Sequence, residues 1–503
     1  MIRRGIFIFL FFLAASPLAV ISQKRETVRY PSPSAERRAA DLIKKLTLDE
    51  KISLLSYDSP GVKRLGIPKY NWWNEALHGV ARAGRATVFP QAIALAATFD
   101  DRLVERVEAE INSALQQNLT TLIKLGLLDP AGSNPYDRIA PEVVNSPEHR
   151  ALAREAAAKS IVLLTNKNKT LPLATNIRSI LITGPNSTDT DVLLANYSGV
   201  SGDLVTVLEG ITNAVSPSTI IFHNKGTAPD NDENQNVHWQ IDQADAVVAV
   251  LGLSPLFEGE QGDAYLSKAG GDKKDISFPA AQLKYLKALR EKTKKPIVVV
   301  LTAGSAINLR EVESLADAVL LAWYPGEQGG NAIADVIFGK ANPAGRLPVT
   351  FYNSDKDLPP FEDYSMKGRT YRYFAGKPLH PFGFGSSYTT FEYGGLSFSK
   401  AADGFRVGVD VKNTGERDGD EVVQVYVRSL NAGQDEPLKR LVNYKRIYIP
   451  RGKTAHVDLS IARSELMIWD ERSNAKGIIP GEYEIQIGAS SEDIRLRRTI
   501  RVN

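Results

Sequence analysis

The spacing of apolar residues predicts helices in the first third of the chain. Over residues 34–56, 101–127 and 147–160, apolar positions recur at helical spacing. The tetrapeptide Thr47-Leu-Asp-Glu50 has the form of a capping box, in which a hydroxyl and a carboxyl side chain close the first turn of a helix. We therefore expect the ordered part of the chain to begin with helices.

A different pattern occupies residues 176–350, where short apolar runs alternate with helical stretches such as 280–292. The apolar runs lie at 179–183, 246–253, 297–301 and 318–322. Nearly continuous apolar strands with helices between them are typical of a mostly parallel sheet that is covered on both faces. Such sheets bind ligands in the loops at the carboxyl ends of their strands.

After Phe391 the apolar period changes to two. Alternating positions lie at 405–411, 423–427 and 483–487, with turn signals at 413–415 and 480–481. Short alternating strands with regular turns, over about a hundred residues, predict a β-sandwich.

The first residues are typical of a signal peptide. Arg3 and Arg4 precede an apolar run from Gly5 to Leu13, and small residues follow it. We expect cleavage after Ser22 and export to the periplasm or the outside of the cell. The alternative is an uncleaved membrane anchor, but the run is short for a spanning helix, so stable membrane insertion is not expected.

Length and composition narrow the classes of function. A chain of 503 residues predicts two to four domains, and 61 basic against 58 acidic residues leave a formal charge of +3 without a basic block. We therefore expect no nucleic-acid partner. The chain has no cysteine, and its six histidines show no metal-ligand spacing, so neither a metal nor another cofactor is expected.

Several phrases, in a fixed order along the chain, resemble the multidomain form of glycoside hydrolase family 3. They include Tyr70-Asn-Trp-Trp-Asn-Glu-Ala-Leu-His-Gly-Val-Ala-Arg82, Leu125-Gly-Leu-Leu-Asp-Pro130, Ala195-Asn-Tyr-Ser-Gly199, Trp323-Tyr-Pro-Gly-Glu-Gln-Gly-Gly330, Asn342-Pro-Ala-Gly-Arg-Leu-Pro-Val349 and Pro381-Phe-Gly-Phe-Gly385. Each phrase is weak alone, and their order and spread carry the resemblance.

The resemblance implies a fold of class α/β plus β. After a signal peptide at 1–22, it implies an incomplete TIM-like (β/α) barrel domain at 23–145, an α/β sandwich domain at 146–352, a linker at 353–390 and a fibronectin type III-like domain at 391–503. It implies a retaining, exo-acting hydrolase that releases xylose, arabinose or glucose from β-linked oligosaccharides. In this family the barrel supplies an aspartate nucleophile, and a loop of the sandwich domain supplies a glutamate acid/base.

Retaining cleavage of a glycosidic bond needs two carboxyl groups about 5 Å apart, one ionised and one protonated. The acidic loop 256–263 follows an apolar strand, at the place where the family carries its acid/base. The glycine before Glu260 favours this residue, and Glu258 is the rival. The alternative is that the loop is only a solvated acidic turn.

The block at 70–82 resembles a sugar subsite of the xylosidase-like branch. Trp73 can stack on a pyranose, and Glu75 and His78 can bond its hydroxyls, so we expect all three to bind substrate. The alternative is that the aromatic rings belong to the core of a barrel rim and that His78 only braces a loop.

The resemblance breaks inside the barrel, which takes about 250 residues in a complete domain. The phrases that resemble the first part of the barrel end at Glu110. From Ile111 onward the sequence resembles the last barrel helix, so the middle of the barrel is missing. The nucleophile phrase falls in the missing stretch, and neither Asp100, Asp101 nor Asp129 replaces it. We therefore expect a truncated barrel and no nucleophile in this chain. The alternative function is a non-catalytic sugar-binding or scaffold protein.

Overall fold

The structure is a computed structural model of the 503-residue chain. It describes residues 35–54, 58–71, 86–112, 142, 144–231, 236, 239–431, 433, 436–470 and 474–502. The predicted signal peptide lies outside these residues. The chain divides into two compact units, the first made of Met1–Trp72 and Gln117–Arg138 and the second of Trp73–Gln116 and Ile139–Asn503.

The first unit contains short elements around a small apolar cluster. They are α1 (Ala35–Lys45), α2 (Leu48–Ser53), the 3-10 turn η1 (Lys63–Leu65) and the antiparallel strands β1 (Asp58–Ser59) and β2 (Tyr70–Asn71). The predicted capping box is confirmed at the start of α2. The Thr47 amide donates to Glu50 Oε2 over 2.9 Å, and the Glu50 amide donates to Thr47 Oγ1 over 3.3 Å.

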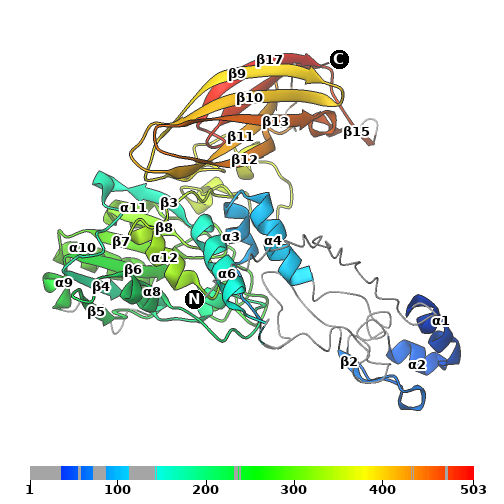
Figure 1. The fold of residues 1–503 in the computed structure, drawn as a ribbon, viewed down its shortest axis with the longest axis horizontal. Coiled ribbons are helices and arrows are strands. Elements are labelled where there is room, and N and C mark those ends of the chain that lie inside the picture. The colour runs from blue at the N-terminus through cyan, green and yellow to red at the C-terminus, as the bar shows by residue number, and fades with distance from the viewer. Residues whose placement is uncertain are drawn as a thin grey trace, which may run out of the picture. The chain divides into compact units, whose positions relative to one another are not determined.

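The second unit is built on a six-stranded sheet in the order β3-β8-β7-β6-β4-β5 (Figure 1). The strands are β3 (Val162–Asn166), β4 (Ser179–Thr183), β5 (Ile220–Asn224), β6 (Ala246–Gly252), β7 (Ile297–Thr302) and β8 (Ala318–Leu321). All neighbours pair in parallel except β3, which runs antiparallel to β8. The predicted mostly parallel sheet is therefore confirmed, with one antiparallel edge strand.

Helices cover both faces of this sheet, as the apolar strands require. The helices of the second unit are α3 (Ala92–Ala97), α4 (Asp101–Asn112), α6 (Pro147–Ser160), α7 (Asp191–Leu194), α8 (Val207–Ala214), α9 (Gln240–Gln243), α10 (Ala280–Lys292), α11 (Arg310–Leu315), α12 (Gly329–Ile337) and α13 (Thr370–Tyr373). Alternate residues of β6 face opposite sides: Val247 lies in a core cluster with α10 and α11, and Val248 lies in another with α8 and α12. Both side chains are fully buried.

A β-sandwich follows the sheet in the chain, as the period of two predicts. One layer is three-stranded, in the order β13-β10-β9, and the other is four-stranded, in the order β12-β11-β16-β17. The strands of the two layers are β9 (Phe391–Ala401), β10 (Gly404–Asn413), β11 (Gly419–Ser429), β12 (Arg440–Ile449), β13 (Thr454–Ala462), β16 (Gly481–Gly488) and β17 (Ile494–Val502), and β14 (Ile468–Asp470) pairs with β15 (Ala475–Gly477) in a separate two-stranded sheet. The inward valines and isoleucines of both layers form one core cluster.

The predicted barrel remnant at 23–145 stays a prediction, since much of that range lies outside the described residues. Its described part in the second unit consists of residues 86–112, with α3 and α4, and of residues 142, 144 and 145. These helices share a core cluster with α6, in which Leu103 and Val107 are buried. Within the described residues, no helix is long and apolar enough to cross a membrane.

Candidate functional site

The loops at the carboxyl ends of the parallel strands meet around one carboxylate, that of Glu258. The chain leaves β6 at Gly252 and enters the acidic loop, while β7 and β8 lead into loops that begin at Ala303 and Ala322. Because parallel strands end at the same edge of a sheet, these three loops are neighbours. The structure therefore places the predicted acidic loop at the edge where ligands bind in folds of this kind.

Glu258 is fixed by donors from the two neighbouring loops. Its Oε2 accepts hydrogen bonds from the Gly304 amide and from the Tyr324 hydroxyl, both over 2.6 Å. Its Oε1 accepts from the Ser305 hydroxyl and lies 3.7 Å from Nζ of Lys273. Only 12% of the Glu258 side chain is exposed, so these contacts hold a largely buried carboxylate in one place.

The groups around Glu258 respond to its charge and to burial. Burial lowers the pKa of Lys273, and the Glu258 carboxylate acts in the opposite direction. Burial also raises the pKa of Tyr324 well above its ordinary value, and the negative charge of Glu258 adds to this effect. Tyr324 is therefore a neutral hydroxyl that donates to Glu258 at neutral pH.

Glu260 differs from Glu258 in its surroundings. Its side chain is exposed, and its Oε1 accepts a hydrogen bond from the hydroxyl of Tyr197. The preceding residue on that segment, Asn196, donates from its side chain to the backbone oxygen of Glu258 over 2.5 Å. One short segment therefore contacts both glutamates of the acidic loop.

Residues with unusual backbone angles flank the two glutamates. Ala195, Tyr197 and Trp323 have φ angles of 55°, 59° and 59°, although none of them is glycine. Positive φ angles at residues other than glycine cost free energy, and they cluster at functional sites where the surroundings enforce them. Here they accompany the contacts that Tyr197 makes with Glu260 and that Tyr324, next to Trp323, makes with Glu258.

A second carboxylate, that of Glu327, is buried close to the start of α12. It accepts hydrogen bonds from the Val88 amide over 3.2 Å, from Asn145 Nδ2 over 2.7 and 2.8 Å and from the Ser201 hydroxyl over 2.6 Å. Burial raises its pKa. Glu327 thus joins three segments that are distant in the sequence, and its role is to brace them.

The glycines of the same phrase serve close packing. A Cβ atom on Gly330 would lie 1.9 Å from the backbone oxygen of Thr206. Only glycine therefore allows α12 to approach the start of α8 this closely.

The structure describes some of the predicted site residues and not others. It places Glu258 and Glu260 in one loop, and Trp73, Glu75 and His78 lie outside the described residues. Tyr197 and Tyr324 were missed as site residues by sequence reasoning. Both stand in phrases that carry the family resemblance, and that was the signal that could have identified them.

The aspartates that were considered as nucleophiles are engaged in structural contacts where the structure describes them. Asp100 Oδ2 accepts from Lys159 Nζ over 2.8 Å, and its Oδ1 accepts from the Leu103 amide at the start of α4. Asp101 accepts from the hydroxyl of Tyr444. Asp129 lies outside the described residues. Among the residues that the structure describes, no group of three or more His, Cys, Asp or Glu side chains is placed to hold a metal ion.

Two known domain families match the chain in succession. The glycosyl hydrolase family 3 C-terminal domain matches residues 161–388, and the fibronectin type III-like domain matches residues 421–491. The first contains the sheet and the acidic loop, and the second lies within the β-sandwich.

Relatives with similar sequences are named as xylosidases and glucosidases. A beta-xylosidase of Formosa agariphila is 37% identical over 402 residues, which are 76% of this chain and 54% of the relative. A periplasmic beta-glucosidase of Salmonella typhimurium is 33% identical over 435 residues, which are 77% of this chain and 55% of the relative. A xylan 1,4-beta-xylosidase of Xylanibacter ruminicola is 43% identical over 271 residues, 53% of this chain and 31% of the relative. The chain thus spans about half the length, or less, of these curated relatives.

Solved structures of glycosidases have a similar fold. A family 3 exo-beta-xylosidase in complex with a xylobiose aziridine probe superposes with a TM-score of 0.79, covering 94% of this chain and 92% of that chain, at 19% sequence identity. A beta-glucosidase from Erythrobacter marinus superposes with a TM-score of 0.63 at 29% identity, covering 80% of this chain and 57% of that one. With the sheet, the acidic loop and the sandwich in the order of these relatives, the chain carries a glycosyl hydrolase family 3 C-terminal domain followed by a fibronectin type III-like domain.

Proposed function

We propose that the chain is the acid/base-bearing part of a retaining, exo-acting β-glycosidase that resembles the β-xylosidases. The relatives named beta-xylosidase and beta-glucosidase support the reaction class. The substrates are oligosaccharides or glycosides that end in xylose, arabinose or glucose.

The observation that carries this proposal is the difference between the two neighbouring glutamates. Glu258 accepts hydrogen bonds from three donors and lies beside Lys273, so its oxygens are engaged within the protein. Glu260 is exposed, and its described contact is one hydroxyl. A general acid must reach the oxygen of a leaving group that arrives from solvent. Glu260 meets this requirement, and Glu258 anchors the loop that presents it.

The other half of the site is proposed from the sequence. We assign Trp73, Glu75 and His78 to the binding of the sugar. Because the family phrases break between Glu110 and Ile111, we infer that the barrel is truncated and that the attacking carboxylate is missing from this chain. The expected behaviour of the chain alone is sugar binding with turnover far below that of complete relatives.

We further propose that the protein is exported after cleavage of residues 1–22. The basic and apolar pattern of that segment supports this. A relative of similar sequence is named as periplasmic.

The assignment of Glu260 can be tested on whatever hydrolysis the purified chain shows. Glu260→Gln should slow hydrolysis of 4-nitrophenyl β-xyloside by roughly 10²- to 10⁴-fold, because the leaving group then lacks its proton donor. A 2,4-dinitrophenyl xyloside, which leaves without protonation, should lose much less. Asp263→Asn, an exposed change in the same loop, is the matched control and should leave both rates unchanged.

Three outcomes would each contradict a different part of the proposal. Turnover equal to that of complete relatives would overturn the missing nucleophile but not the reaction class. If calorimetry with xylobiose shows binding and chromatography shows unchanged sugar, the non-catalytic alternative holds for this chain. Absence of both binding and hydrolysis would overturn the glycosidase proposal.

A further inference from the structure

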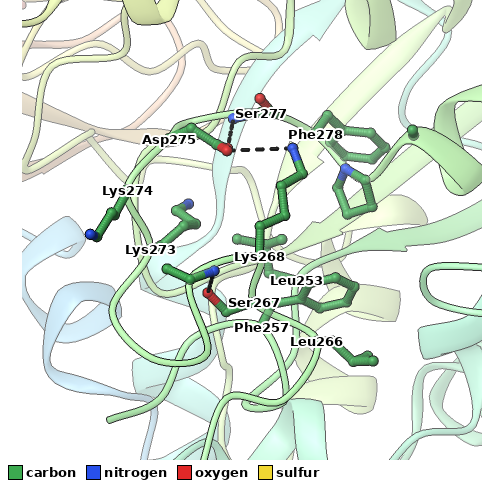
Figure 2. Close-up of a pocket in the computed structure, with 13 residues that line it drawn as sticks. Leu253, Phe257, Leu266, Ser267, Lys268, Lys273, Lys274, Asp275, Ser277 and Phe278 are labelled. Atoms are coloured by element: carbon green, nitrogen blue, oxygen red, sulfur yellow. Dashed lines mark hydrogen bonds and ion pairs between the residues drawn. The ribbon is translucent and has the colours of Figure 1, made fainter. Parts of the chain in front are cut away.

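A hollow of about 560 Å³ lies within the long loop that joins β6 to α10. All of its lining residues come from the chain between Leu253 and Ala280 (Figure 2). Its apolar lining includes Leu253, Phe257, Leu266 and Phe278. A hollow of this volume with a mainly apolar wall is the usual form of a small-molecule site.

The hollow does not include Glu258 or Glu260, but two residues of its wall are connected to Glu258, one through the chain and one through a side-chain contact. Phe257 lines the hollow, and the carboxylate of the next residue, Glu258, bonds to Gly304 and Tyr324. Lys273 also lines the hollow, while its ammonium group donates to the Ser305 hydroxyl over 2.7 Å and lies 3.7 Å from Glu258. Neither Glu258 nor Glu260 lines the hollow.

The side chain of Lys268 extends across the hollow, and its ammonium group can bind an anionic ligand. Lys268 extends to Asp275, with 3.4 Å between Nζ and Oδ2 (Figure 2). Lys268 is 81% exposed, and ion pairs this exposed contribute little to stability. Asp275 also accepts a hydrogen bond from the Ser277 amide over 2.9 Å. An incoming anion can therefore share Lys268 without leaving Asp275 unpaired.

We infer that this hollow binds a small molecule with one aromatic ring and one carboxylate. The ring would pack on Phe257, Leu266 and Phe278, where burial of apolar surface provides the driving force. The carboxylate would lie at Lys268 and accept a charge-assisted hydrogen bond from its ammonium group. A sugar fits poorly, because its many hydroxyl groups would lose water against an apolar wall.

Trans-cinnamate is a suitable probe, with cinnamyl alcohol as its uncharged counterpart. We expect cinnamate to bind the full chain in calorimetry with a Kd on the order of 1 mM, which is what a ligand of this size can reach. Cinnamyl alcohol should bind about two- to fivefold more weakly, the factor expected from loss of one exposed ion pair. Xylose should not compete with cinnamate. This competition keeps the test independent of the proposed glycosidase site.

Two variants locate the binding in this hollow. Lys268→Gln should weaken cinnamate binding by a similar factor and leave the binding of cinnamyl alcohol unchanged. Lys294→Gln, a change of an exposed lysine just after α10, is the matched control and should change neither. Ala269→Trp, which fills the hollow from its rim, should abolish the binding of both ligands.

Hydrogen exchange gives a second readout, the protection of the loop that contains both the hollow and Glu258. Cinnamate should protect the backbone amides of residues 254–279 in the parent chain and fail to do so in Ala269→Trp. Failure of cinnamate to bind the parent chain, or equal binding to Ala269→Trp, would overturn the inference. Binding that xylose displaces would also overturn it, since the ligand would then occupy the sugar site.

Discussion

The guanidinium group of Arg346 donates from Nη2 to Oε2 of Glu421 over 3.1 Å, and only 2% and 4% of the two side chains are exposed. Arg346 follows α12 of the sheet domain, and Glu421 belongs to β11 of the sandwich. The second oxygen of Glu421 accepts from the Tyr393 hydroxyl over 2.9 Å. A fully buried ion pair therefore joins the family 3 C-terminal domain to the fibronectin-like domain.

Removal of one partner of this pair should destabilise both domains together. Glu421→Gln leaves the Arg346 charge buried without its counter-ion, and breaking a buried pair in this way costs about 3–5 kcal/mol. We expect this loss in the free energy of unfolding, measured by urea denaturation followed by fluorescence. Glu416→Gln, an exposed change before the same strand, should have little effect.

The double variant Arg346→Met, Glu421→Met tests whether the charge itself is responsible. Two apolar side chains of similar length should restore much of the loss, because neither leaves a buried charge unpaired. If the double variant is as unstable as Glu421→Gln, the pair acts through its shape and not through its charge.

Substitution of Glu258 should change the stability of the acidic loop, whereas substitution of Glu260 should not. Glu258→Gln replaces an accepting oxygen by an NH₂ group that faces donors, so it should lower the free energy of unfolding by about 1–3 kcal/mol. Hydrogen exchange of residues 254–279 should become faster. Glu260→Gln changes an exposed side chain and should leave both measurements unchanged. The assignment fails if Glu260→Gln is the variant that loosens the loop.

Strands and helices were predictable where the local pattern decides the structure. The runs at 179–183 and 297–301 became β4 and β7, because a strand buried on both faces must be apolar at every position. The helix at 147–160 became α6, whose start is fixed by Ser146, which accepts from the His149 amide, and by Pro147 in the first turn.

The site was predictable only in part, because its geometry depends on contacts between distant segments. The acidic loop could be located from the strand before it, but the difference between Glu258 and Glu260 comes from the loops that carry Gly304 and Tyr324. The sequence of the loop alone does not indicate which of the two carboxylates accepts these hydrogen bonds. Similarly, the partner of Glu260 is Tyr197, which lies 63 positions earlier in the chain.

The first unit offers a test of electrostatics on a single exposed pair. The Arg64 side chain bonds Glu50 and, with the amide of Thr47, lowers the pKa of Glu50 to about 2. Because this pKa lies below the model-peptide value, the pair's contribution is present above about 4.5 and is lost as the pH falls through about 2. Arg64→Gln should raise the pKa of Glu50 toward its ordinary value in an NMR titration. Lys51→Gln should leave it near 2, and an unchanged value in Arg64→Gln would show that the helix start alone sets it.

Glu327 should give the opposite pH dependence. Burial raises its pKa, so its stabilising contribution is complete below about pH 4.5 and is lost as the pH rises through the folded-state value. The difference in unfolding free energy between the parent chain and Glu327→Gln should therefore shrink as the pH rises from 4.5 to 8. Asn145→Ala removes a hydrogen-bond donor that lowers the pKa of Glu327. The pKa should therefore rise further, and the difference in unfolding free energy should decline at a higher pH. A difference that grows with pH would mean that the ionised carboxylate, held by Val88 and Ser201, is the form that stabilises the fold.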